Sequence, residues 1–224
     1  MIMGRRSGDL IYRPNGRARG HKYGSLLIIG ALVLMAAGTA RAETFEFEGP
    51  YAVRVLHQGS EIEISGTFSW ALPQQVSVAL AEAPQARLVR LESPGGHIKA
   101  ALEVADMIHA RNLDTYVGRM CASACTLAFL AGHQRFATEA ARLGFHQAHG
   151  PGLTPADSNL LLRLAYQNYS LPLAFIAHVL RTSPQDLWVP DLAELRKAGV
   201  VTDIAPTGAI AASVASGATD AHGN

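Results

Sequence analysis

The chain has 224 residues, of which 49% are hydrophobic and 17% are charged, and its formal net charge is +1. This length and composition allow one domain with a substantial core and leave little room for a second. Seven of the 19 Lys and Arg residues, but one of the 18 Asp and Glu residues, lie within residues 1–42. The rest of the chain is therefore acidic, which argues against nucleic-acid binding because that function needs a basic face.

Residues 1–42 have the features of an export signal. A polar, Arg-rich stretch precedes an apolar run over residues 26–40, and Arg41 and Ala42 follow, so that the segment ends in Ala-Arg-Ala. This order is typical of a secretory signal peptide, and the run is shorter than the ~20 residues that span a bilayer comfortably. We therefore predict export to the periplasm or to the outer face of the inner membrane, with cleavage after Ala42. The alternative is a retained anchor, in which residues 26–40 contact the membrane.

Residues 43–204 alternate between strand and helix patterns. Period-two alternation predicts a β-hairpin from strands at 51–57 and 61–65. The other predicted strands lie at 87–91, 113–117, 134–137, 141–145 and 200–204, those at 134–137 and 141–145 forming a short pair. Apolar periodicity and end signals predict helices at 72–83, 100–108, 121–131, 156–181 (interrupted near Pro172) and 192–198. This order predicts one α/β domain with a mostly parallel sheet, followed by a disordered tail at 205–224.

A glycine turn follows the strand at 87–91, in the sequence Ser93-Pro94-Gly95-Gly96. Two adjacent glycines let the backbone approach a ligand closely and leave N–H groups exposed. The helix that follows adds the positive end of its dipole. Such a turn can hold a bound anion or an oxyanion that forms during a reaction.

Ser123 lies in the segment Cys121-Ala-Ser-Ala-Cys125, where a strand is expected to give way to a helix. Its hydroxyl and the Ala124 N–H would lie together at the helix N-terminus, so Ser123 is either a nucleophile or an ordinary N-cap. Two cysteines do not make a disulfide framework or a zinc site. At i, i+4 spacing they could pair in an oxidising compartment, but we favour two small buried thiols.

A base and an acid are also available to this serine. His146 ends the strand predicted at 141–145, and His97 and His149 are rival bases. The candidate acids are Asp157, Asp186 and Asp191. A hydrolytic triad needs a nucleophile, a base and a group that fixes the tautomer of the base, together with donors for the oxyanion. The sequence offers each part, and spacing alone does not separate the candidates.

Taken in order, these segments resemble the proteolytic subunit of the Clp protease. The resemblance runs over residues 50–204 and rests on Leu91-Glu-Ser-Pro-Gly-Gly96, the Ser123 segment and Phe145-His-Gln147. It is closest to exported Clp-like proteins of bacteria, which share the Cys-x-Ser-Ala-Cys pattern. It implies the Clp/crotonase-like spiral, an α/β fold in which β-β-α units stack within a single domain.

The resemblance also implies roles for individual residues. Ser123 would be the nucleophile, His146 the general base and Asp186 the third member of the triad, with the amides of Gly95 and Ala124 as the oxyanion hole. The implied activity is that of an exported serine peptidase that acts on peptides or proteins without a cofactor or a metal. Since ATP is lacking outside the cytoplasm, we expect no dependence on an unfolding ATPase. Family members assemble into rings, so we expect a homo-oligomer.

Two other functions stay open at this point. A non-catalytic Clp-like scaffold could use the glycine turn to bind a carbonyl or carboxylate ligand. A crotonase-type acyl-CoA enzyme would use the same oxyanion donors. The second is disfavoured because CoA is not available outside the cytoplasm and the sequence shows no basic phosphate-binding patch.

Overall fold

The structure, a computed structural model, describes residues 49–150 and 154–205. The predicted export signal and all but the first residue of the predicted tail lie outside these ranges. Within the described ranges, no helix has the length and apolar character needed to cross a membrane.

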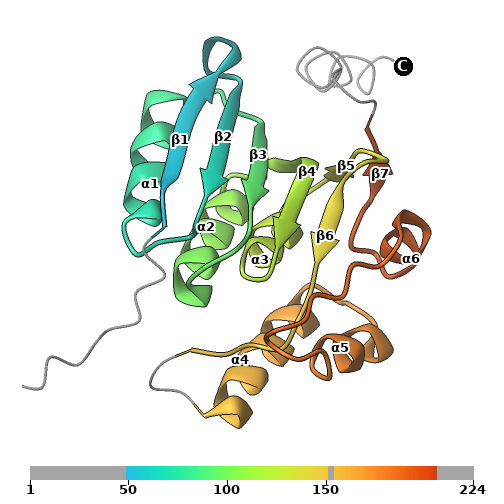
Figure 1. Cartoon of the computed structure of the whole chain (residues 1–224). Coiled ribbons are helices and arrows are strands. Elements are labelled where there is room, and N and C mark those ends of the chain that lie inside the picture. Colours follow the sequence, from blue (N-terminus) through green and yellow to red (C-terminus); the bar gives the residue numbers. More distant parts are fainter. Residues whose placement is uncertain (1–48, 151–153, 206–224) are drawn as a thin grey trace, which may run out of the picture. The chain divides into compact units, whose positions relative to one another are not determined.

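A seven-stranded sheet forms the centre of the described domain (Figure 1). Its order is β1-β2-β3-β4-β5-β7, and β6 also pairs with β4. β1 and β2 form the antiparallel hairpin that the sequence predicts, and the remaining pairings are parallel. The strands are β1 (Tyr51–Leu56), β2 (Glu61–Gly66), β3 (Leu88–Ser93), β4 (Asp114–Ala122), β5 (Arg135–Ala137), β6 (Arg142–Gly144) and β7 (Asp203–Ile204). The prediction of a mostly parallel sheet in an α/β domain is therefore confirmed.

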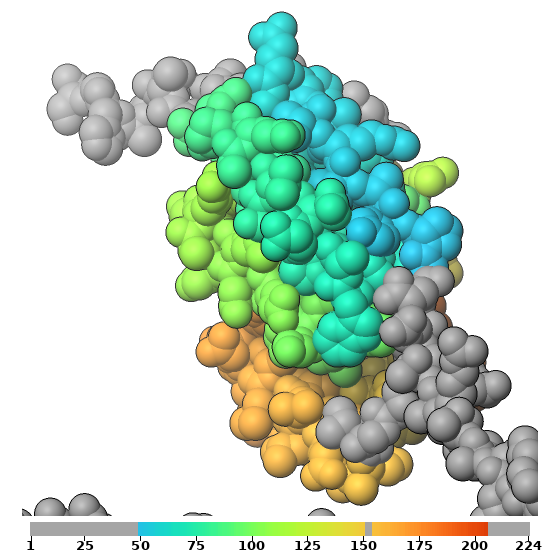
Figure 2. Space-filling model, turned by 90° about the vertical axis from the view of Figure 1, so that its left-hand side faces the viewer, coloured from blue at the N-terminus to red at the C-terminus, as the bar shows by residue number. Residues whose placement is uncertain are grey.

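The first three helices connect the parallel strands and pack in a row, α1 against α2 and α2 against α3. The helices are α1 (Leu72–Glu82), α2 (Ile98–Ala110), α3 (Cys125–Leu130), α4 (Pro155–Asn168), α5 (Leu173–Val179) and α6 (Leu192–Lys197), with a short 3-10 turn η1 (His57–Gly59) inside the hairpin. Figure 2 shows one face of the domain, with the blue to green segment from β1 to α2 above and the orange helical segment after β6 below.

The core forms where the apolar sides of these helices meet the sheet. α2 buries Ala101, Val104 and Ile108, which recur at helical spacing on one side. Of the six residues of β3, Leu88, Val89, Leu91 and Ser93 are buried. A strand with few exposed positions is expected in the centre of a parallel sheet, because both of its faces are covered. The glycine turn thus follows a strand that the core holds rigidly.

Three elements differ from the prediction. The helix predicted at 121–131 begins only at Cys125, because β4 continues to Ala122 by pairing with β6. The strands predicted at 134–137 and 141–145 do not pair with each other: β5 and β6 each pair with a different part of β4. The strand predicted at 200–204 is reduced to the two residues of β7.

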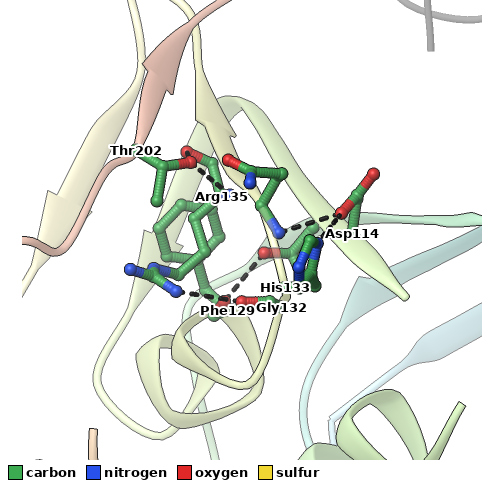
Figure 3. Close-up of polar contacts among 8 residues, drawn as sticks. Asp114, Phe129, Gly132, His133, Arg135 and Thr202 are labelled. Atoms are coloured by element: carbon green, nitrogen blue, oxygen red, sulfur yellow. Dashed lines mark hydrogen bonds and ion pairs between the residues drawn. The ribbon is translucent and has the colours of Figure 1, made fainter. Parts of the chain in front are cut away.

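Side-chain contacts hold the short strand β7 on the sheet (Figure 3). Arg135 of β5 donates from Nη2 to the Gly199 carbonyl at 2.9 Å, and its backbone N–H donates to the Thr202 hydroxyl at 2.7 Å. At the start of β4, Asp114 accepts a hydrogen bond from the backbone N–H of Gln134 at 2.9 Å. These contacts fix the β5 end of the β4–β5 connection, which includes the helix that follows Ser123.

Candidate active site

The glycine turn between β3 and α2 is held by hydrogen bonds on two sides. The N–H of Gly95 donates to the Ser93 hydroxyl at 3.0 Å. On the other side, the Gly95 carbonyl accepts from the N–H of Phe68, and the N–H of His97 donates to the Phe68 carbonyl, both at 2.8 Å. The segment after β2 therefore pairs with the turn and fixes its backbone.

Gly95 lies directly against the segment that carries Ser123. Its φ is +106°, and a Cβ at this position would lie 2.7 Å from the Ala122 carbonyl oxygen and 2.7 Å from Ser123 Cβ. Both the backbone conformation and the lack of space explain why glycine stands here. The contact places the turn and Ser123 side by side.

Ser123 forms a sharp turn between β4 and α3, with a left-handed φ of +54°. Its N–H donates to the Gly144 carbonyl at 2.8 Å, and its carbonyl accepts from the N–H of Thr126 at 3.0 Å and from the Thr126 hydroxyl at 2.7 Å. A non-glycine residue in this conformation costs about 1–3 kcal/mol and persists where its surroundings hold it, commonly at functional sites. The side chain is partly exposed.

Cys121 and Cys125 form a disulfide around this turn, and their Cα atoms are 5.4 Å apart. The interpretation as two separate thiols is therefore wrong. Because β4 runs through Ala122 and the chain reverses at Ser123, the two Cα atoms come within the range of about 4.4–6.8 Å that a disulfide requires. Both cysteines are fully buried.

His146 follows β6 and is only partly exposed. Its Nδ1 lies 2.8 Å from the main-chain carbonyl of Gln147. A carbonyl only accepts, so this contact assigns the proton to Nδ1 and leaves Nε2 as the basic nitrogen. Burial lowers the pKa of His146; the bond to Gln147 opposes this shift, and the nearby His149 adds to it. His146 is thus neutral, in the form of a base, near pH 7.

The structure brings Ser123, His146 and Gly95 together in one pocket of about 260 Å³. The pocket is lined by Thr67, Pro94, Gly95, Gly96, Ile98, Ser123, His146, Ala148, His149 and Pro184. Of the rival bases, His149 also lines it, whereas His97 stacks on Trp70 with ring centroids 4.3 Å apart. Among the described residues no group of three His, Cys, Asp or Glu side chains is placed to hold a metal ion.

The two N–H groups predicted as the oxyanion hole differ in availability. The N–H of Gly95 is already bonded to Ser93, whereas that of Ala124 has no acceptor in the described ranges. The N–H of Gly96 also lacks an acceptor there, and it points away from Phe68, since Gly95 and His97 provide the groups that face Phe68. The sequence singled out Gly95 and not Gly96, because two adjacent glycines cannot be told apart without the turn geometry; the role of Gly95 stays a prediction.

None of the three candidate acids contacts His146 within the described residues. Asp186 is exposed, and its N–H closes a turn on the Ser183 carbonyl. Asp157 accepts a hydrogen bond from Thr154 at the start of α4. Asp191 caps α6 by accepting from the N–H of Glu194. The role of Asp186 as the third member of a triad stays a prediction. In this structure the main-chain carbonyl of Gln147, not a carboxylate, contacts Nδ1 of His146.

The sequence was compared with protein families, with curated proteins and with solved structures. Residues 52–158 match the family model described as Clp protease, and this range includes Ser123 and His146 but ends before Asp186. No curated protein is significantly similar to the sequence.

Among solved structures, ClpP1 from Listeria monocytogenes matches with a TM-score of 0.58 at 19% identity, over 66% of this chain and 92% of that chain. A point mutant of the same protein matches with a TM-score of 0.54 at 22% identity, over the same shares of the two chains. A membrane-bound stomatin-specific protease has a TM-score of 0.48 at 17% identity, over 64% of this chain and 77% of that chain, which is too low to support an argument. The described domain therefore has the Clp/crotonase-like fold, and its residues 52–158 match the Clp protease family.

Proposed function

We propose that the chain is a serine peptidase that hydrolyses peptide bonds in peptides or proteins. The observation that carries the proposal is the pocket in which Ser123 and His146 lie together beside the glycine turn. Each component has the chemistry that acyl transfer needs: a hydroxyl on a strained turn, a neutral imidazole, and backbone donors that have no acceptor among the residues that the structure describes. The match of this region to the Clp protease family supports the same reaction.

In the proposed mechanism, Nε2 of His146 takes the proton of Ser123 Oγ as this oxygen attacks the substrate carbonyl carbon. The N–H groups of Gly96 and Ala124 donate to the oxyanion of the tetrahedral intermediate. The C–N bond then breaks, and His146 gives its proton to the leaving amine. Water, activated by His146, releases the acyl group from Ser123.

Two features of the site depend on the state of the enzyme. Within the described residues, Ser123 Oγ and His146 form no hydrogen bond, and we expect this bond to form when substrate closes the site, as is common for catalytic contacts in free enzymes. The main-chain carbonyl of Gln147 orients His146 in the free enzyme. Asp186 is the alternative orienting group, and it would have to approach His146 to act.

We also propose that the protein is exported, as the sequence of residues 1–42 predicts, and that it works as a homo-oligomer without an ATPase. The Cys121–Cys125 disulfide supports export, because disulfides persist in oxidising compartments and are rare in the cytosol. Cell fractionation with detection of the mature N-terminus tests this proposal. An intact N-terminus in the cytosolic fraction would contradict it.

A peptide library tests the proposed activity. We expect Ser123→Ala and His146→Ala each to lower kcat/KM by at least about 10³-fold, because each removes a group that acts in the transition state. Ser77→Ala and His109→Ala are matched controls, since both side chains are exposed and lie on α1 and α2, outside the pocket. Hydrolysis by Ser123→Ala at the wild-type rate would refute the proposal.

Among the described residues no carboxylate contacts His146, and this favours one second candidate, a non-catalytic scaffold that binds a carboxylate or carbonyl group with the same donors. This candidate predicts that the wild-type protein binds a peptide with a free C-terminus and cleaves nothing. Ser123→Ala would then keep the wild-type affinity in calorimetry. A wild-type protein that cleaves the library excludes it.

A further inference from the structure

We propose that the Cys121–Cys125 disulfide is a positioning element for the nucleophile, and that hydrolysis requires this disulfide to be closed. The proposal rests on the peptidase function proposed above. It concerns a bond that joins the end of β4 to the first residue of α3. Ser123 lies at the midpoint of the five residues that the bond encloses.

The chain changes direction within these five residues. Sheet pairing holds Cys121 and Ala122 on the strand side, and on the helix side the Ala124 carbonyl accepts a hydrogen bond from the N–H of Leu127. Ala122 is still in β4, Ser123 is left-handed, and Ala124 already has the helical φ of −54° and ψ of −29°. The bonds to Gly144 and Thr126 act on Ser123 itself. α3 has six residues, and so short a helix is not stable by its own hydrogen bonds.

The disulfide adds a covalent constraint to the packing that holds this short, fully buried helix. By linking Cys121 to Cys125, it holds the strand before the turn to the helix after it. Both cysteines are fully buried in the main core. Bonded sulfurs are about 2.05 Å apart, whereas non-bonded heavy atoms keep about 3.5–4.0 Å. Two reduced thiols therefore need more room, and because both side chains lie in a fully packed core, we expect the end of β4 or the start of α3 to shift to provide it.

Such a shift acts directly on the oxyanion donors. The position of a Cβ on Gly95 would lie 2.7 Å from the Ala122 carbonyl oxygen and 3.1 Å from the Ala124 nitrogen. The glycine turn and the Ala122–Ala124 segment are thus in close contact, so movement of the segment changes the spacing between the N–H of Ala124 and the N–H of Gly96. The substrate pocket itself is lined by residues other than the two cysteines. Loss of the bond should therefore lower kcat and leave KM nearly unchanged.

The proposed regulation is a two-electron reduction. A dithiol reductant transfers two electrons and two protons, the S–S bond breaks, two cysteine thiols form, and the dithiol becomes a cyclic disulfide. Because both sulfurs are buried, we expect this reduction to be slow in the folded protein. The peptidase would accordingly have a low kcat while it is reduced in the cytosol and would reach its full kcat on oxidation after export.

The test compares the oxidised protein, the protein reduced with dithiothreitol and the double variant Cys121→Ala/Cys125→Ala on one peptide substrate. We expect kcat to fall at least about tenfold on reduction, KM to change less than about twofold, and reoxidation to restore kcat. The double variant should have the kcat of the reduced protein and should not respond to dithiothreitol. Mass spectrometry of alkylated samples confirms the thiol state, and circular dichroism confirms the fold.

The outcomes separate this proposal from the function on which it rests. An oxidised wild-type protein that cleaves no peptide refutes the peptidase function. A fully reduced, folded protein with the kcat of the oxidised form refutes the positioning role, as does a change confined to KM. If the double variant does not fold, the reduced wild-type protein decides the question alone.

Discussion

Substitution of Gly95 by Ala tests the contact between the glycine turn and the nucleophile segment. The new Cβ would lie 2.7 Å from the Ala122 carbonyl oxygen and 2.7 Å from Ser123 Cβ, at a φ of +106°. The positive φ costs about 1–3 kcal/mol, and overpacking against backbone costs about 1–3 kcal/mol more. We therefore expect the free energy of unfolding to fall by about 2–6 kcal/mol.

Gly199→Ala is the matched control, because it isolates the cost of the positive φ from the cost of overpacking. Gly199 ends α6 with a φ of +72°, and among the described residues nothing lies within 4 Å of a Cβ at this position. The free energy of unfolding of this variant should fall by about 1–2 kcal/mol, the cost of a non-glycine residue in the left-handed conformation. The two variants are compared with the wild type by urea denaturation.

Activity separates the two variants further. Because the Ala in Gly95→Ala must displace the Ala122–Ala124 segment, we expect kcat to fall by about 10²-fold, the cost of losing one oxyanion donor. Gly199→Ala should keep the wild-type kcat. If Gly95→Ala were as stable as Gly199→Ala and as active as the wild type, the close contact between the turn and Ser123 would be refuted.

Three further predictions concern the base, the acid and the support of the nucleophile. kcat/KM should fall as the pH drops and His146 gains a proton. Because burial lowers the pKa of His146, the midpoint of this fall in the pH profile should lie below pH 6.5. A midpoint above pH 6.5 would contradict the burial argument. Asp186→Asn should change kcat by less than about threefold, since the Gln147 carbonyl orients His146 in the free enzyme. A fall near the ~10⁴-fold typical of a triad Asp would instead support Asp186 as the third member of the triad. Tyr166→Phe removes the 3.0 Å contact between the Tyr166 and Thr126 hydroxyls. This change should lower the free energy of unfolding by about 1 kcal/mol. An unchanged midpoint in urea denaturation would show that this buried contact does not stabilise the fold.

The sequence predicted the elements whose signals are local. Period-two alternation located the β1–β2 hairpin. Apolar periodicity and end signals located α1, which begins at Leu72 as predicted and has Pro73 in its first turn. The prediction failed where a tertiary partner decides the conformation. Residues 118–122 have no strong strand pattern, and they extend β4 because β6 provides a parallel partner. The start of α3 was misplaced for the same reason.

The parts of the site that depend on main-chain geometry could not be predicted. The disulfide needs the left-handed turn at Ser123, which residue types do not encode. The choice between Gly95 and Gly96 depends on which N–H the Ser93 hydroxyl accepts from. The partner of His146 is a carbonyl of Gln147, and every residue carries such a group, so no sequence signal points to it. The likeness to the Clp protease, rather than spacing, is what singled out Ser123 and His146 among the serines and histidines.

Covalent labelling tests the central claim, that Ser123 is a nucleophile activated by His146. The protein is incubated with a fluorophosphonate, and the modified residue is located by mass spectrometry. We predict one adduct on Ser123 in the wild type, none in Ser123→Ala, and labelling at least about 10²-fold slower in His146→Ala, since general-base help contributes about 10²–10⁴-fold. An adduct on another residue, or equal labelling of the wild type and Ser123→Ala, would contradict the claim.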